Sequence, residues 1–156
     1  MKKVFVNGVF DILHRGHIEL LAYAKQQGDY LVVAIDSDES VKKSKGPTRP
    51  INTAEDRKFM LDALSFTNAV LIFEDQEHLA SIIEEYEPDV MVKGSDYKNQ
   101  PIVGAENCKE IIFFERLNGY STTKTIQHIV NRWCLRGHLH IRLCRSYQSR
   151  STCACV

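Results

Sequence analysis

Two histidines three residues apart are the side chains in this sequence whose types and spacing most directly suggest chemistry. His14 and His17 lie in the stretch NGVFDILHRGHIELL, residues 7–21, which follows a short apolar run. Imidazoles can donate hydrogen bonds to phosphate oxygens without a permanent charge, and the free N–H groups at a helix start favour anions. Gly8, just before them, lets backbone approach a ligand closely. This combination favours a phosphate site at the start of a helix.

Other interpretations of the same pair stay open on spacing alone. Each histidine could be a packed or solvent-facing residue, and the pair could be half of a zinc site. The sequence up to residue 132 offers no neighbouring cysteine and no H-E-x-x-H context to complete such a site. The fingerprints G-x-G-x-x-G and G-x-x-x-x-G-K-[ST] are both absent, which excludes an ordinary dinucleotide site and a Walker loop.

Short apolar runs alternate with helical periodicity along residues 1–132, and these elements must position the histidines. Strands are expected at residues 3–6, 30–36, 69–73, 89–94 and 110–114, and helices at 17–28, 53–64, 77–86 and 121–132. The first helix should bury Ile18, Leu21 and Ala22, Asn52 is expected to cap the second, and the polar stretch 42–52 should form a loop.

This alternation predicts right-handed crossovers and an α/β fold, namely a doubly wound, five-stranded parallel sheet of Rossmann-like type with helices on both faces. Ligands of such sheets bind beyond the carboxyl ends of the strands, where the strand order reverses. The first strand is the usual place for that reversal, and the histidine stretch leaves its carboxyl end.

Two motifs resemble those of a known family. GVFDILHRGH, residues 8–17, resembles the G-x-F-D-x-x-H-x-G-H signature of the cytidylyltransferase-like nucleotidyltransferases, and GYSTTKTI, residues 119–126, resembles their second signature. The resemblance covers about residues 1–131. It implies transfer of a nucleotidyl group from a nucleoside triphosphate (ATP or CTP) to a phosphorylated sugar or alcohol, with release of pyrophosphate. It also implies Mg²⁺ as the cofactor that accompanies the triphosphate.

The resemblance assigns roles to particular residues. The implied catalytic residues are His14, His17 and Lys45, and the implied nucleotide-binding residues are Gly8, Val9, Phe10, Asp11, Arg116, Gly119, Ser121, Thr122 and Thr123. Weaker substrate-binding candidates are Arg57, Lys93, Asp96 and Tyr97, and no protein-held metal ion is expected. Each of these residues also has a structural interpretation. Lys45 could lie in a solvated loop, Ser121 could be a plain helix cap, and residues 93–97 could form an ordinary β-turn. Arg57 could be a surface charge paired with a nearby acid, or it could support the active-site loop.

The substrate is the least determined part. Residues 45–52, 92–97 and 102–106 resemble the adenylyltransferase domains of ADP-heptose synthases, which implies transfer of AMP from ATP to D-glycero-β-D-manno-heptose 1-phosphate for lipopolysaccharide or related glycans. RLNGYSTT, which contains Arg116, instead resembles glycerol-3-phosphate cytidylyltransferases, which make CDP-glycerol. A nucleotide-binding module without catalysis is a third hypothesis. Relatives commonly form dimers, so the resemblance also implies a homodimer as one assembly.

Composition sets the remaining expectations. The 156 residues carry a formal net charge of zero, which gives no reason to expect nucleic acid or a membrane as partner. No apolar run approaches the ~20 residues of a membrane span. The apolar run at the start is interrupted by Asn7 and Asp11, unlike a signal peptide, so a cytoplasmic protein is expected.

The composition changes at Trp133. Residues 133–156 contain four arginines, no acidic residue and four of the five cysteines. We therefore expect a nucleotidyltransferase domain over residues 1–132 and a basic, cysteine-rich tail over 133–156. The spacing of Cys134, His138, His140 and Cys144 is not a usual zinc-finger pattern, and we expect an appended tail without a selected function.

Overall fold

The computed structural model describes residues 1–115 and 119–134. The elements are β1 (Lys3–Gly8), α1 (Arg15–Lys25), β2 (Tyr30–Asp36), α2 (Asp38–Lys45), α3 (Ala54–Asp62), β3 (Ala69–Phe73), α4 (Gln76–Tyr86), β4 (Val90–Gly94), the 3₁₀ turns η1 (Ser95–Tyr97) and η2 (Ala105–Asn107), β5 (Glu110–Phe114) and α5 (Thr122–Cys134). The chain divides into two units, Met1–Asn118 and Gly119–Val156, and each is described by itself.

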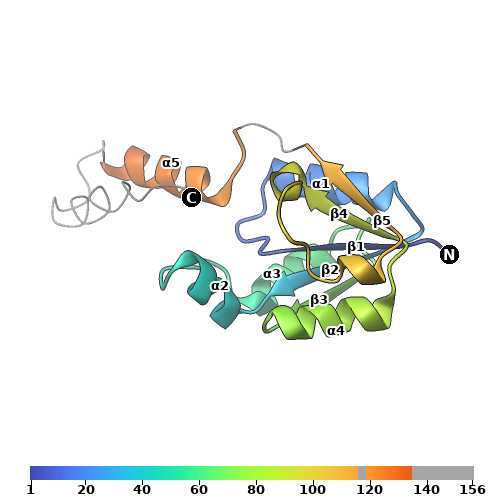
Figure 1. The fold of residues 1–156 in the computed structure, drawn as a ribbon. Helices are drawn as coiled ribbons and strands as arrows, with labels where there is room; N and C mark the ends of the chain where they lie inside the picture. The colour runs from blue at the N-terminus through green and yellow to red at the C-terminus, as the bar shows by residue number, and fades with distance from the viewer. Residues whose placement is uncertain (116–118, 135–156) are drawn as a thin grey trace. The chain divides into compact units, whose positions relative to one another are not determined.

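The first unit is built on one five-stranded sheet in which all pairs are parallel (Figure 1). The strand order is β3-β2-β1-β4-β5. The chain moves outward from β1 to β3, returns to β4 on the other side of β1, and then continues outward to β5. The strand order therefore reverses between β1 and β4, which confirms the predicted doubly wound fold and places the reversal at the first strand.

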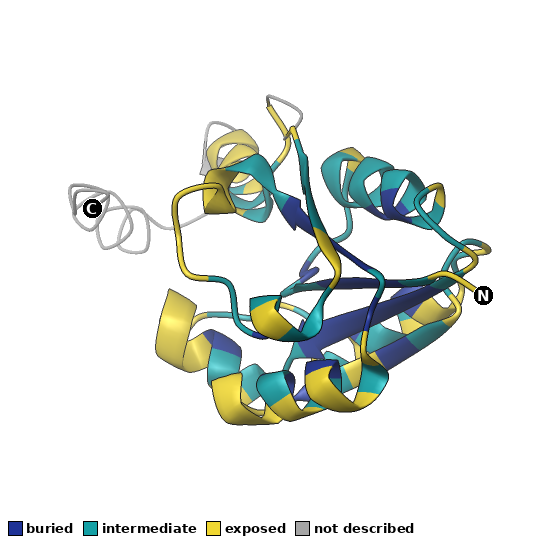
Figure 2. Cartoon of the chain, turned by 45° about the vertical axis from the view of Figure 1, so that its right-hand side comes forward, coloured by how far each residue is buried: buried dark blue, intermediate teal, exposed yellow. Residues whose placement is uncertain are grey.

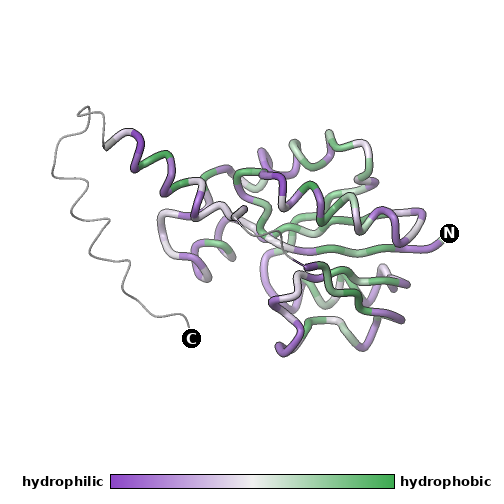
Figure 3. The backbone as a smooth tube through the Cα atoms, turned by 90° about the horizontal axis from the view of Figure 1, so that it is seen from above, coloured by the Kyte–Doolittle hydropathy of each residue, from purple (hydrophilic) through white to green (hydrophobic). Residues whose placement is uncertain are grey.

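The sheet is covered on both faces, and each face has its own apolar cluster. On one face Leu21 of α1 and Leu61 of α3 pack with Val6 of β1. On the other face Leu79 of α4 packs with Phe5 of β1. The central strands β1, β2 and β4 carry most of the buried residues and the outer sides of the helices are exposed (Figure 2), and apolar residues concentrate along the strands (Figure 3). Successive residues of a strand point to opposite faces, so the face of each β1 side chain follows from its position.

The first helix differs from the prediction in its phase. Leu21 is buried as expected, but Ala24 is the second buried residue, while Ile18 and Ala22 are half-buried. The helix begins two residues earlier than predicted, at Arg15, because His14 acts as its N-cap.

The predicted loop over residues 42–52 is partly wrong, because α2 extends to Lys45. Ser37 caps this helix by accepting a hydrogen bond from the backbone N–H of Ser40, at 3.2 Å. Acidic residues in the first turn, lysines in the last turn and the buried Val41 complete a regular pattern of helix signals. The helix α3 is capped one residue later than predicted, by Thr53 and not by Asn52.

The second unit contains α5, which extends two residues beyond the predicted helix, to Cys134. Ser121 precedes it, and its Oγ accepts a hydrogen bond from the backbone N–H of Lys124 at 3.1 Å. The interpretation of Ser121 as a helix cap is therefore confirmed. The predicted boundary at residue 133 stays a prediction, and most of the predicted tail, residues 135–156, lies outside the described residues. None of the described helices has the length and apolar character that crossing a membrane requires.

Candidate active site

The two histidines of the first motif lie at the N-terminus of α1, at the carboxyl end of β1. His14 is the N-cap, and its Nδ1 accepts a hydrogen bond from the backbone N–H of His17 at 3.3 Å. The two rings stack with their centroids 3.7 Å apart, and the His17 ring also packs against Phe10. An imidazole that accepts at Nδ1 carries its proton on Nε2, so His14 can present an N–H donor to an anion.

The loop between β1 and α1 has an unusual backbone that explains the glycine before it. Phe10 and Ile12 both have positive φ, at 50° and 49°. A Cβ at Gly8 would lie 3.2 Å from the ring of Phe10, which folds back over the strand end. Gly8 therefore makes room for the Phe10 ring, and its contact with a nucleotide stays a prediction.

Asp11 holds a second loop against this one. Its carboxylate is almost completely buried and accepts hydrogen bonds from the backbone N–H groups of Ile51, at 2.9 Å, and Asn52, at 3.0 Å. It also forms an ion pair with Arg49 at 2.9 Å. Asp11 was predicted to bind the nucleotide, and that contact stays a prediction. Its oxygens connect the histidine loop to residues 49–52.

Arg57 is not a surface charge, so that alternative is wrong. Its side chain is fully buried and its guanidinium donates to the carbonyl of Val9 at 2.8 Å and to Asp38 Oδ1 at 2.8 Å. A third bond runs from Nε to the carbonyl of Asn52 at 3.1 Å. The geometry supports the other interpretation, in which Arg57 holds the loops of the site together, and its direct contact with a substrate stays a prediction.

Lys45 is the exposed last residue of α2, and not a loop residue. Burial raises the pKa of Asp36, at the end of β2, while Ser40, Arg57 and Lys45 oppose this rise. The positive charge of Lys45 therefore acts on the carboxyl end of β2. The catalytic role of Lys45 stays a prediction.

Lys93, in contrast, lies on the strand next to β1. It is 7% exposed, and its Nζ donates to Asn7 Oδ1 at 2.5 Å. The ring of Tyr97, in the 3₁₀ turn η1, lies 5.3 Å from the same nitrogen. The β-turn alternative is thus replaced by a 3₁₀ turn, in which Asp96 and Tyr97 are exposed.

The second motif belongs to the second unit. Gly119 has φ +96°, a backbone conformation that favours glycine, and Ser121, Thr122 and Thr123 form the start of α5. Arg116 lies outside the described residues. The roles of these five residues at the nucleotide stay predictions.

Residues that the motifs did not indicate also contribute to the site. Asn7 and Asp36 lie beyond the apolar part of their strands, and the continued strand period was the signal that could have placed them on one face. Arg49, the partner of Asp11, had no signal in the sequence beyond its place in the Pro-rich stretch.

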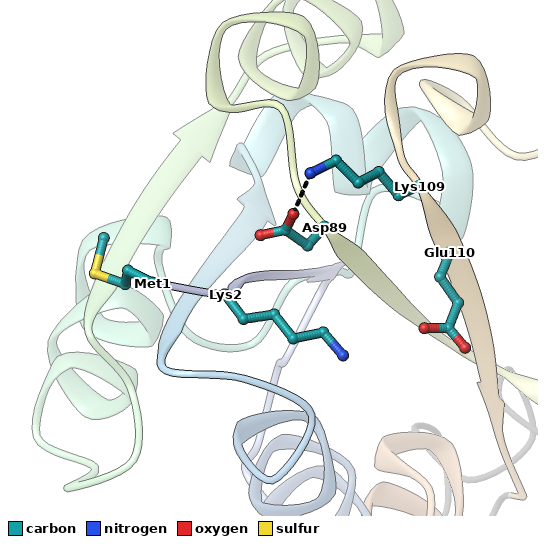
Figure 4. A pocket seen from close by; sticks show the side chains of 5 residues that line it. All are labelled: Met1, Lys2, Asp89, Lys109 and Glu110. Carbon is teal, nitrogen blue, oxygen red and sulfur yellow. Dashed lines mark hydrogen bonds and ion pairs between the residues drawn. The ribbon is translucent and has the colours of Figure 1, made fainter.

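A shallow pocket lies at the opposite, amino-terminal edge of the sheet (Figure 4). It is lined by Met1, Lys2, Asp89, Lys109 and Glu110, and Lys109 forms an ion pair with Asp89 at 2.6 Å. Parallel sheets bind ligands at the carboxyl edge, so this pocket does not belong to the candidate site. Across residues 1–115 and 119–134, no group of three or more His, Cys, Asp or Glu side chains could hold a metal ion.

Comparison with known proteins agrees with this geometry. The family model described as "Cytidylyltransferase-like" matches residues 5–140. The chain belongs to this family. The membership confirms the predicted enzyme class, a nucleotidyltransferase.

Curated relatives give a finer comparison. The cytidylyltransferase-like chain is 45% identical over 140 residues to the "Bifunctional protein HldE" of Sulfurimonas denitrificans, and this match covers 90% of the chain and 28% of the relative. It is 47% identical to the protein of the same name from Campylobacter concisus, over 82% of the chain and 27% of the relative. The chain thus spans little more than a quarter of the length of these relatives.

Solved structures support the fold. The crystal structure of a lipopolysaccharide core biosynthesis protein from Thermoplasma volcanium superposes with a TM-score of 0.63 and 25% identity, over 76% of this chain and 99% of the other. A pantothenate synthetase from Thermus thermophilus superposes with a TM-score of 0.51 at 14% identity, over 74% and 56% of the two chains. The second likeness concerns the fold alone.

Proposed function

We propose that this chain transfers the adenylyl group of ATP to heptose 1-phosphate and releases pyrophosphate. The observation that carries the proposal is the 45–47% identity to HldE proteins over 82–90% of this chain. The H-x-G-H histidines at the reversal of strand order support it. Three separate stretches that resemble ADP-heptose synthase adenylyltransferase domains favour the heptose acceptor. A lipopolysaccharide core biosynthesis protein among the structural neighbours is consistent with it.

The reaction needs no protein nucleophile. An oxygen of the acceptor phosphate attacks the α-phosphorus of ATP, a new P–O bond forms, and the bond to the β-phosphate oxygen breaks as pyrophosphate leaves. A phosphate monoester is mostly a dianion at pH 7, so no general base has to remove a proton. The protein therefore acts by positioning both phosphates and by stabilising negative charge that develops during transfer.

In this proposal His14 and His17 serve the phosphates of ATP. The hydrogen bond from the His17 backbone to Nδ1 holds the His14 ring and leaves the proton on Nε2, which is proposed to donate to a phosphate oxygen. The stacking of His17 on Phe10 and on His14 limits the rotation of both rings. The dipole of α1 adds a favourable field for anions at the same point. Ser121, Thr122 and Thr123 are proposed to bind the β- and γ-phosphates, on the resemblance of their motif.

Magnesium is proposed to arrive with the triphosphate. Asp11 is the buried carboxylate of the histidine loop, and it already accepts bonds from Arg49, Ile51 and Asn52. Mg²⁺ is often held by substrate phosphates and waters with few protein ligands, so the donor set present here fits an ion carried by ATP. When bound, the ion offsets the charge of the triphosphate.

Pyrophosphate release over a matrix of substrates tests the proposal. ATP and CTP are each offered with heptose 1-phosphate and glycerol 3-phosphate, in the presence of Mg²⁺. Turnover with ATP and the heptose is expected, and His14→Ala should lower it by roughly 100-fold or more. His78→Ala, which removes an exposed histidine of α4, is the matched control and should leave turnover unchanged.

Turnover only with CTP and glycerol 3-phosphate would contradict the proposal and favour the cytidylyltransferase reaction that the residues around Arg116 suggest. The absence of turnover in all four mixtures, for the wild type and for His78→Ala, would contradict both reactions.

A further inference from the structure

Three polar side chains form a row across the carboxyl end of the sheet. Asn7 follows Phe5 by two residues on β1, Lys93 follows Met91 by two on β4, and Asp36 follows Ala34 by two on β2. Phe5, Met91 and Ala34 all belong to the apolar cluster under α4. Because strand residues two apart share a face, Asp36, Asn7 and Lys93 lie on the α4 face of three adjacent strands.

Lys93 is the cation of this row, and it is buried. Its Nζ donates a hydrogen bond to Asn7. In the described parts of the chain no Asp or Glu oxygen lies within ion-pair distance of it. An ammonium has three N–H donors, so Lys93 has hydrogen-bonding capacity that Asn7 alone does not use.

The surroundings compensate the charge only in part. Burial lowers the pKa of Lys93 to about 8, and Asp36 opposes this only through its more distant charge. Tyr97 of η1 offers its ring face, and the register partner on β5 is Phe113. Beneath the row, α4 contributes the apolar Leu79 and Ile83. A buried cation of this kind is costly unless an anion joins it.

We propose that Lys93, positioned by Asn7 at the reversal of strand order, binds the phosphate group of the acceptor substrate. This inference rests on the proposed nucleotidyl transfer and specifies which side chain holds the attacking phosphate. Lys93 touches the reacting group in this proposal, whereas Asn7 acts through Lys93 and is a positioning residue.

The position of Lys93 distinguishes the acceptor from ATP as its ligand. His17 belongs to α1 and packs on Phe10, a member of the cluster on the α1 face of the sheet. Lys93 lies on the other face, so it approaches the carboxyl edge from the opposite side. In-line displacement requires the attacking and leaving oxygens on opposite sides of the α-phosphorus. Ligand groups that enter from the two faces satisfy this requirement.

Steady-state kinetics of Lys93→Met provide the first test. Methionine keeps the length of the side chain and removes the charge. We expect the KM for the acceptor phosphate to rise roughly 10- to 100-fold, the loss of a charge-assisted hydrogen bond, while the KM for ATP stays unchanged. Lys98→Met is the matched control, because Lys98 is an exposed lysine close by that pairs with Glu115, and it should leave both constants unchanged.

The pH profile gives a readout that a merely structural role would not alter. Lys93 is protonated below pH 8, so the wild-type kcat/KM for the acceptor should fall as pH rises through about 8. Lys93→Arg retains a permanent cation and should retain activity without this alkaline fall. Asn7→Ala should move the alkaline fall, because Lys93 loses its acceptor.

Calorimetric titration separates failure of this inference from failure of the proposed function. Heptose 1-phosphate and glycerol 3-phosphate are titrated into the wild-type chain and into Lys93→Met, without ATP. Binding by the wild type that is lost in the variant supports the inference even when no turnover occurs. Equal binding by both, no binding by the wild type, or a rise in the KM for ATP instead of the acceptor would overturn it.

Discussion

Asp11 shows how one buried side chain can hold two loops of the site together. Its buried carboxylate receives two backbone N–H groups and Arg49, and so fixes the stretch 49–52 against the histidine loop. Asp11→Asn keeps the shape but removes the ion pair and turns part of the acceptor into a donor. We expect the free energy of unfolding to fall by about 2–4 kcal/mol in urea denaturation.

Asp62→Asn is the control for this change, because Asp62 forms a surface pair with Lys58. Its loss should cost less than about 1 kcal/mol. Equal effects of the two variants would show that the contacts of Asp11 with residues 49–52 contribute little to stability.

The burial of the Lys93 ammonium, which favours binding of an anion, should also lower the stability of the fold. Burial lowers its pKa from 10.5 to about 8, so the folded state binds this proton less tightly than the unfolded state. Below pH 8 the penalty is present in full, and it is relieved as pH rises from about 8 to 10.5. Lys93→Met should therefore raise the free energy of unfolding at pH 7, by up to roughly 3 kcal/mol.

The measurement is urea denaturation of both proteins at pH 7 and at pH 9.5. The wild type should gain stability from Lys93 across this interval, and the methionine variant should lack that contribution. A variant that is less stable than the wild type at pH 7 would argue against an uncompensated charge.

Among the elements, α2 carries Lys45, and Ser37 at the end of β2 caps this helix. Ser37→Ala removes the hydrogen bond to the Ser40 backbone and should destabilise α2 by about 1 kcal/mol. Amide hydrogen exchange should show faster exchange in residues 40–45, with little change in α4. Ser81→Ala, on the exposed side of α4, is the control. Unchanged exchange of α2 in the Ser37→Ala variant would contradict the role of the cap.

The strands illustrate what the sequence could predict. The spans of β2, β3 and β5 agree with the apolar runs that predicted them. For β2 the reason is burial on both faces, which requires continuous apolar residues. The helix α2 was missed because only Val41 is buried, so its apolar period is too weak to stand out from the Pro-rich stretch that follows. Only the cap residue and the charges of its first and last turns indicate α2 in the sequence.

The candidate site was only partly predictable for a related reason. The motif placed His14 and His17 at a helix start. The roles of Asp11 and Arg57 depend instead on contacts between distant parts of the sequence. Asp11 and Asn52 are 41 residues apart, and Arg57 and Val9 are 48 residues apart. Such pairs are set by strand order and loop packing, which no local pattern in one sequence reveals. Asn7 and Asp36 continue the period of their strands, but the strand order was needed to place them beside Lys93.

At the scale of the whole molecule, the tail provides a test of where the functional chain ends. A variant without residues 135–156 keeps all of α5, and we expect its turnover and its melting temperature to match those of the full chain. Loss of activity, or a change of assembly in sedimentation analysis, would show that the tail takes part in function. The predicted homodimer would be tested in the same experiment.

The proposed reaction moves the adenylyl group of ATP, which contains the α-phosphorus, onto a sugar phosphate. The most direct measurement follows ATP labelled at the α-phosphorus in a mixture with heptose 1-phosphate, Mg²⁺ and the protein. We expect the label to appear in a nucleotide sugar that resists phosphatase and has the mass of ADP-heptose, with one pyrophosphate released for each. Label that remains in ATP, or appears only in free AMP, would contradict the account.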